Sequence, residues 1–162
     1  MRGLGHTILG ISPGTQIMGI AVFEGKVLVD RGCKIFKGKY SDSKLEKIIK
    51  TIERYVEDYE VEALALKVNS ERSTSTFMEE IISKVIDFAK DKGLPVYQYT
   101  IDEIKKCFSD CEINNKIELL EKTVERIPEL LYEYKKELKK GEGYYIRMFE
   151  AVAVAIICAD EI

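Results

Sequence analysis

The sequence predicts an α/β fold in which a five-stranded mixed β-sheet is flanked by helices. Two observations predict this class. The first forty residues hold three strand-like segments joined by short turns, which is typical of an antiparallel meander. Further along the chain, apolar residues follow the helical period, and two short apolar runs alternate with the helices. Because strands that alternate with helices are usually parallel, we expect the second half of the sheet to be parallel.

The strand assignments depend on short apolar runs bounded by turn residues. The strands are expected at residues 7–11, 18–24, 27–36, 61–68 and 94–99. Ser12-Pro-Gly-Thr15 is a turn signal between the first two strands, and Gly25 with Lys26 closes a tight turn before the third. The run at 61–68 is rich in apolar residues, which indicates a buried strand.

The helices are predicted from apolar residues that recur at the helical spacing. They are expected at residues 45–59, at 77–90, and over most of the chain from 101 onward. Asp42 or Ser43 can cap the first helix. Pro128 interrupts the long C-terminal helical stretch, and residues 141–143 separate the last helix. The Lys- and Glu-rich stretch 132–140 is typical of a solvated helix with i,i+4 charge pairs.

Length and composition exclude several classes of protein. The 162 residues predict a single domain over 1–162, and 46% hydrophobic with 33% charged residues excludes a disordered chain. The longest apolar run, residues 151–159, is too short for a membrane span, which needs about 20 residues. Four scattered cysteines and one histidine indicate a cytoplasmic protein without a disulfide framework. The net charge of −3 is unusual for a protein whose main role is to hold a polyanion.

Several segments match a known family in order and spacing. They are Ile8–Thr15 followed by Gly19–Val22, Ala63–Lys67, Gly93–Thr100 followed by Glu103–Lys106, and Glu150–Ala155. Together they resemble the RuvC family of Holliday-junction resolvases. The resemblance covers nearly the whole chain except residues of about 120 to 143, which we interpret as an altered or inserted helical segment. It implies a ribonuclease H-like fold with the order βββαβαβα.

The resemblance also implies a catalytic site, and this chain departs from it. Members of the family hydrolyse phosphodiesters at four-way junctions with four carboxylates that hold two divalent metal ions. The corresponding positions here are Ser12, Lys67, Arg147 and Glu150. Their side chains sum to a charge of +1, whereas four carboxylates sum to about −4. Because Mg²⁺ prefers anionic oxygen ligands, we predict no metal site, no cofactor and no catalytic role for these four residues.

Three interpretations of the substituted positions stay open. Lys67, Glu150 and Arg147 can form a salt-bridge cluster that stabilises the fold where the family holds metal. The same cations can receive a DNA phosphate in a protein that binds without cutting. Alternatively, relocated carboxylates rebuild a site for Mg²⁺ or Mn²⁺ and keep a metal-dependent endodeoxyribonuclease active. The candidates for such relocation are Glu71, Asp160 and Glu161. A protein-interaction domain on the same fold is the non-enzymatic alternative.

The resemblance names further positions close to DNA. The candidate nucleic-acid-binding residues are Lys67, Lys105, Lys106, Lys116 and Arg147. Asp110 and Glu112 stand where the family carries no charge, and they would repel a nearby phosphate. The resulting hypothesis is a catalytically inactive relative that binds branched or duplex DNA as a homodimer, with no membrane association.

Overall fold

The computed structural model describes residues 6–69, 76–108 and 116–162, and five strands in these ranges form one sheet. The strands are β1 (Thr7–Ser12), β2 (Ile17–Glu24), β3 (Val27–Ile35), β4 (Ala63–Lys67) and β5 (Val96–Tyr99). Their order across the sheet is β3-β2-β1-β4-β5. β1, β2 and β3 pair antiparallel, whereas β1 with β4 and β4 with β5 pair parallel. The predicted five-stranded mixed sheet is therefore confirmed.

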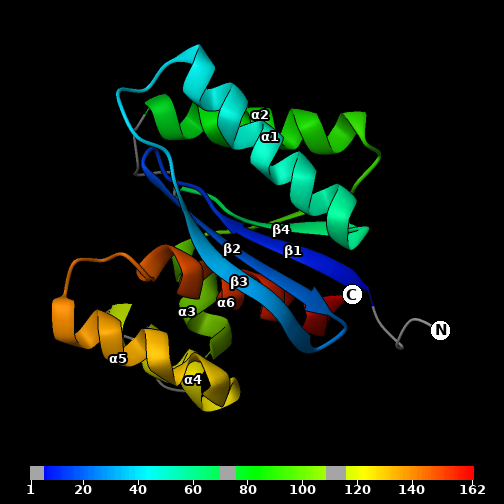
Figure 1. Cartoon of the computed structure of the whole chain (residues 1–162). Helices are drawn as coiled ribbons and strands as arrows, with labels where there is room; N and C mark the ends of the chain where they lie inside the picture. The colour runs from blue at the N-terminus through cyan, green and yellow to red at the C-terminus, as the bar shows by residue number, and fades with distance from the viewer. Residues whose placement is uncertain (1–5, 70–75, 109–115) are drawn as a thin grey trace.

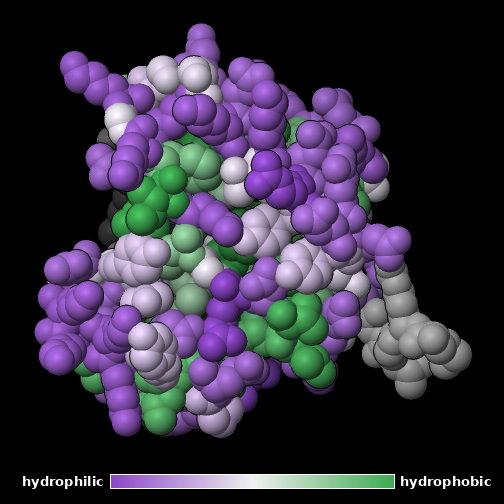
Figure 2. All heavy atoms as spheres, viewed as in Figure 1, coloured by the Kyte–Doolittle hydropathy of each residue, from purple (hydrophilic) through white to green (hydrophobic). Residues whose placement is uncertain are grey.

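Helices cover both faces of the sheet. They are α1 (Asp42–Tyr59), α2 (Thr76–Asp91), α3 (Ile101–Phe108), α4 (Lys116–Arg126), the 3₁₀ helix η1 (Pro128–Leu130), α5 (Leu131–Lys140) and α6 (Ile146–Glu161). In Figure 1, α1 and α2 lie on one face, and α3 to α6 lie on the other. Figure 2 shows hydrophilic side chains over most of the face in view, with apolar side chains in small separate patches.

Alternation along the strands divides the core into two clusters. In β1, Leu9 and Ile11 point toward α1 and α2, where they join Ile48 and Ile52 of α1. Ile8 of the same strand belongs to the cluster on the opposite side, with α6. Since successive side chains of a strand point to opposite faces, one buried strand supplies both clusters.

Helix α6 is the most deeply buried helix of the described chain, and glycines allow it to approach the sheet. Its residues from Met148 to Cys158 are all buried. A Cβ on Gly10 of β1 would overlap the Ala151 carbonyl oxygen and lie 2.9 Å from Ala155 Cβ. The backbone of α6 thus lies directly on the strand, which is the close approach that a glycine inside a strand often marks. Neither α6 nor any other helix of the described chain is long and apolar enough to cross a membrane.

The start of α1 differs from the sequence-based prediction. Ser41 is the N-cap, and its side chain accepts a hydrogen bond from the Lys44 backbone N–H at 3.2 Å. Asp42 and Ser43, the caps that the sequence predicts, both lie inside the first helical turn. The extended backbone of Ser41 (φ −160°, ψ 167°) suits a cap. Asp42 instead places a negative charge at the positive end of the helix dipole.

The prediction that the Lys- and Glu-rich stretch is a solvated helix is wrong for one face of α5. Glu133 and Glu137 are buried, with 7% and 4% of their surface exposed. Glu133 accepts a hydrogen bond from Arg31 Nε of β3 at 2.6 Å. Glu137 accepts backbone N–H bonds from Gly143 and Tyr145 at 2.8 and 2.7 Å. These two carboxylates connect α5 to the edge strand and to the loop before α6.

Buried Cys158 and half-buried Cys33 are expected to be chemically inert near neutral pH. Burial raises the pKa of the Cys33 and Cys158 thiols to about 11. Because the thiolate is the nucleophile, both should react with iodoacetamide at pH 8 at least about tenfold more slowly than exposed Cys107. Their rates should rise as the pH approaches 11. Peptide mass spectrometry measures the three rates, and urea-unfolded protein is the control in which they should converge. Equal rates in the native protein would contradict the burial.

Candidate functional site

The candidate site begins where strands β1 and β4 end. β1 and β4 are parallel neighbours, so their carboxyl ends meet at one edge of the sheet. Ile11 pairs with Leu66 in this register, which places Ser12 and Lys67, the next residue of each strand, side by side. Both are the last residues of their strands. The sheet therefore brings together two of the four positions that the sequence singled out.

The first turn of α6 brings the other two positions to the same edge. Ser12 pairs with Gly19 of β2, and a Cβ on Gly19 would overlap the backbone of Arg147. Glu150 follows Arg147 by three residues and so lies on the same face of the helix. Gly19 therefore supports this site, a role that is not among the sequence-based predictions, although a glycine within an apolar strand is a signal of close approach.

Glu150 lies at the centre of these four residues and is 1% exposed. Ser12 Oγ donates a hydrogen bond to Glu150 Oε1 at 3.0 Å. Lys67 Nζ forms an ion pair with Oε2 at 3.2 Å, although no well-aligned hydrogen bond to Oε2 is found within the described residues. Arg147 Nη1 lies 3.8 Å from Oε1, which is an ion-pair distance and too long for a hydrogen bond. We call Ser12, Lys67, Arg147 and Glu150 the Glu150 cluster.

The two cations of the Glu150 cluster differ in their access to solvent. The Lys67 side chain is 13% exposed, and its ammonium faces the buried carboxylate. The Arg147 side chain is 33% exposed and is held more loosely, at 3.8 Å. One carboxylate cannot neutralise both, so the cluster carries a net charge of +1. Its chemistry suits contact with an anion, because a guanidinium has five N–H donors and can bond a phosphate through two of them.

The Glu150 cluster does not fit a divalent metal ion. Ser12 Oγ donates its proton to the one carboxylate present, and a lysine ammonium faces the other carboxylate oxygen. Mg²⁺ is normally held by one or more carboxylates without competing cations. At an effective dielectric constant of about 20, each unit charge 4 Å away would repel a divalent ion by roughly 8 kcal/mol. The donor set therefore opposes a metal at these four residues.

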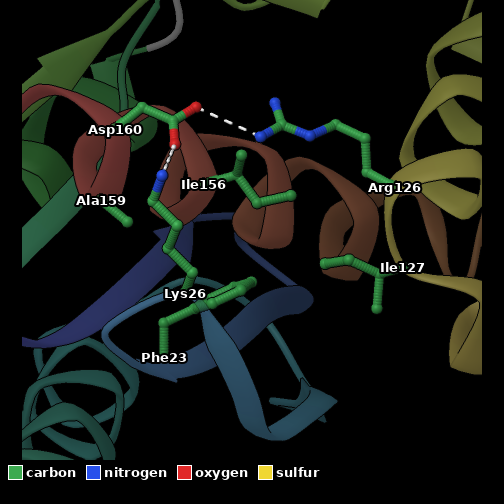
Figure 3. A pocket seen from close by; sticks show the side chains of 7 residues that line it. All are labelled: Phe23, Lys26, Arg126, Ile127, Ile156, Ala159 and Asp160. Atoms are coloured by element: carbon green, nitrogen blue, oxygen red, sulfur yellow. Dashed lines mark hydrogen bonds and ion pairs between the residues drawn. The ribbon is translucent and has the colours of Figure 1, made fainter. Parts of the chain in front are cut away.

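Asp160, one candidate for a relocated carboxylate, lies far from the cluster. It follows Glu150 by ten residues in the same helix, which corresponds to about 15 Å along the axis. Figure 3 shows its carboxylate between two cations, with Lys26 Nζ at 3.7 Å and Arg126 Nη2 at 3.2 Å. Asp160 thus closes one side of a small pocket with an apolar floor, away from the strand ends that hold Ser12 and Lys67.

Within the described chain, the other candidates for a relocated carboxylate add none to the Glu150 cluster. Glu161 accepts a hydrogen bond from the Tyr99 hydroxyl at 2.8 Å, at the far end of α6. Burial, followed by this bond, raises the pKa of Tyr99. Glu71 lies outside the described residues. In residues 6–69, 76–108 and 116–162, no group of three or more His, Cys, Asp and Glu side chains is placed to hold a metal ion.

The remaining candidate DNA contacts lie on the helical layer that contains α6. Lys105 and Lys106 are in the last turn of α3, with Lys105 half-buried and Lys106 exposed. Lys116 begins α4, and its side chain lies outside the described part of the chain. Asp110 and Glu112, which were expected to repel phosphate, also lie outside it. α3 packs against both α4 and α6.

Comparison with known proteins identifies the family. The family model of the crossover junction endodeoxyribonuclease RuvC matches residues 8–157. This chain belongs to the RuvC family. The fold of *Thermus thermophilus* RuvC in complex with a Holliday junction substrate matches at a TM-score of 0.72, with 17% identity over 93% of this chain and 91% of that one. A second *Thermus thermophilus* RuvC structure matches at 0.68, with 18% identity and the same coverage. Comparison with curated protein sequences gave no match.

The RuvC comparison confirms both the resemblance and the ribonuclease H-like fold that the sequence predicted. The matched range includes all four residues of the Glu150 cluster. It also includes the segment 120–143, which contains η1, α5 and most of α4. In this member of the RuvC family, the strand ends and the start of α6 thus carry a cationic cluster around one buried glutamate.

Proposed function

We propose that this RuvC family member binds branched or duplex DNA in the cytoplasm without cutting it, and that it does so as a homodimer. The observation that carries the proposal is the Glu150 cluster, which is net positive at the edge where β1 and β4 end and α6 begins. A cationic cluster favours a polyanion, and it disfavours the divalent ions that hydrolysis would need.

Arg147 is the residue best placed to contact a phosphate. Glu150 is already within 3.2 Å of Lys67 and accepts a hydrogen bond from Ser12. This leaves the charge of Arg147 poorly compensated, and one third of its side chain reaches solvent. Lys105, Lys106 and Lys116 are proposed as additional contacts along the backbone. The *Thermus thermophilus* RuvC solved with a Holliday junction substrate supports DNA as the ligand class.

A specific observation also favours contact with a protein. Leu131, Tyr132 and Leu138 of α5 are exposed large apolar residues, and Leu131 and Leu138 lie two turns apart on the same side of the helix. Apolar residues grouped on a surface helix mark protein contacts. We assign this surface to the homodimer, and a protein-interaction domain that does not bind DNA is the alternative.

A gel-shift and cleavage experiment on one four-way DNA junction tests the proposal. The junction is incubated with the protein in EDTA and again with Mg²⁺ or Mn²⁺, and sedimentation of the free protein reports whether it is a dimer. We expect a shifted band and intact strands in every condition. Metal-dependent cleavage would overturn the loss of catalysis. No shift at low salt, where phosphate contacts are strongest, would favour the protein-interaction alternative.

Charge reversal at Arg147 should weaken junction binding specifically. We expect Arg147→Glu to reduce the affinity for the junction by about 10- to 150-fold, the effect of one charged hydrogen bond. The slope of log affinity against log salt concentration should also become shallower by about 1, as expected for the loss of one phosphate contact. The matched control is Arg54→Glu, which makes the same change in net charge at an exposed position of α1, on the opposite face of the sheet. Equal losses in the two variants would contradict a specific contact.

A further inference from the structure

A second concave site lies between the end of α5 and the start of α6, the helix that carries Arg147 and Glu150. It has a volume of about 210 Å³ and is lined by Lys136, Glu137, Lys140, Glu142, Tyr144 and Tyr145. We call it the tyrosine pocket. Tyr145 precedes α6, so the tyrosine pocket is within one helical turn of Arg147. Much of its wall comes from α5, in the segment where the motifs of the RuvC resemblance are lacking.

The loop that forms the tyrosine pocket is held in place from several directions. Both oxygens of buried Glu137 accept backbone N–H bonds, one from Gly143 and one from Tyr145. The Sγ of Cys33 donates a hydrogen bond to the Tyr144 carbonyl oxygen at 3.1 Å. Gly141 ends α5 in the left-handed conformation (φ 61°) that glycine adopts readily. A loop held this firmly loses little conformational entropy when a ligand binds.

The two tyrosine rings have different roles. Tyr145 packs against the core cluster around α6, whereas Tyr144 is half-buried and is not part of that cluster. Their rings meet edge to face, with centroids 4.8 Å apart and planes at 87°. Tyr145, which packs on the core, thus contacts and supports the Tyr144 ring. Such an arrangement fixes the orientation of the Tyr144 ring and makes it a platform for stacking.

The charges of the tyrosine pocket favour a neutral ligand. Two ammonium groups, from Lys136 and Lys140, are balanced by the carboxylates of Glu137 and Glu142. A free phosphate gains little from a site with no net charge. A planar ring with both hydrogen-bond donors and acceptors can stack on Tyr144, accept from a lysine and donate to Glu142. A nucleobase has this chemistry, and the pocket is smaller than the roughly 300–1,000 Å³ typical of sites for drug-sized ligands, which suits a single ring system.

We propose that the tyrosine pocket takes one unpaired nucleobase of the DNA strand whose phosphate contacts Arg147. The base stacks on Tyr144, and Lys140 and Glu142 contact its polar edge. This inference rests on the proposed DNA binding, and it adds a preference for DNA with an unstacked base over fully paired DNA.

The test compares two DNAs that differ by one base. A fluorescent duplex with a single unpaired adenine is compared with the same duplex carrying an abasic site at that position, and affinities are measured by anisotropy. We expect the wild-type protein to prefer the adenine by about 5- to 150-fold, the range for stacking of one base on an aromatic ring. Tyr144→Leu should abolish this preference, whereas Tyr144→Phe should keep it. Tyr55→Leu, which removes a tyrosine of α1, is the matched control and should also keep it.

The remaining outcomes separate the possible failures. Lys140→Gln, at an exposed position, should lower the preference without changing the fold, so the test does not depend on the folding of Tyr144→Leu. If wild-type protein binds both DNAs equally, the tyrosine pocket proposal is overturned and DNA binding stands. If it binds neither, the proposed function itself fails.

Discussion

Replacing Gly19 by alanine is expected to lower the free energy of unfolding by about 3 kcal/mol, the upper end of the usual cost of overpacking. The added methyl group would overlap the carbonyl oxygen and carbon of Arg147, and these are backbone atoms that cannot rotate away. Relief requires the first turn of α6 to move off the sheet. The same movement would separate Arg147 and Glu150 from Lys67, so we also expect a loss of DNA affinity.

Urea unfolding followed by circular dichroism measures the effect of Gly19→Ala. The matched control is Gly32→Ala in β3, where a Cβ would meet no atom within 4 Å. Since alanine restricts the unfolded chain more than glycine does, this control is expected to be neutral or to stabilise by up to about 1 kcal/mol. If the two variants unfold at the same urea concentration, the close contact between Gly19 and α6 does not exist in solution.

Replacing Glu150 by glutamine is expected to lower the free energy of unfolding by about 3 to 5 kcal/mol. Glutamine keeps the shape of the side chain and an oxygen that can accept from Ser12, but it removes the charge. Lys67, 13% exposed, then faces a neutral amide. Removal of the carboxylate from a buried ion pair has this large cost because the remaining ammonium loses a buried counter-charge 3.2 Å away.

Two further variants separate this mechanism from a general loss of packing. Glu46→Gln removes the carboxylate of an exposed ion pair with Lys50, 3.2 Å long, and should cost less than about 1 kcal/mol. The double variant Lys67→Met with Glu150→Gln should be more stable than Glu150→Gln alone, because the mostly buried ammonium that faced the lost carboxylate is removed with it. Urea unfolding of the three proteins gives the comparison. A double variant that is less stable than the single one would contradict the ion-pair explanation.

Much of the fold could be predicted from local patterns in the sequence. The short turns at residues 12–15 and at Gly25 predict the antiparallel strands, because tight turns are local properties of the chain. The spacing of apolar residues predicts α1 and α2 within a few residues of their observed ends. The cap of α1 was missed, since Ser41, Asp42 and Ser43 are equally good capping residues by type.

The buried acids of α5 could not be predicted in this way. Glu133 is bonded to Arg31, which lies 102 residues earlier in the chain. Glu137 is bonded to backbone groups of the loop that follows α5, and any residue at those positions would supply the same N–H donors. No local pattern distinguishes such a carboxylate from a solvated one. The tyrosine pocket depends on these contacts and was therefore invisible before the helices were placed.

The sequence by itself determined which side chains occupy the strand ends and the start of α6, and therefore the net positive charge of the Glu150 cluster. Only the tertiary structure decided how closely each of the two cations approaches the carboxylate of Glu150. Lys67 lies 3.2 Å from the buried carboxylate, whereas Arg147 lies 3.8 Å away with a third of its surface in solvent. These differences of tenths of an ångström are set by the packing of α6 on Gly10 and Gly19, and the order of residues along the chain does not specify them.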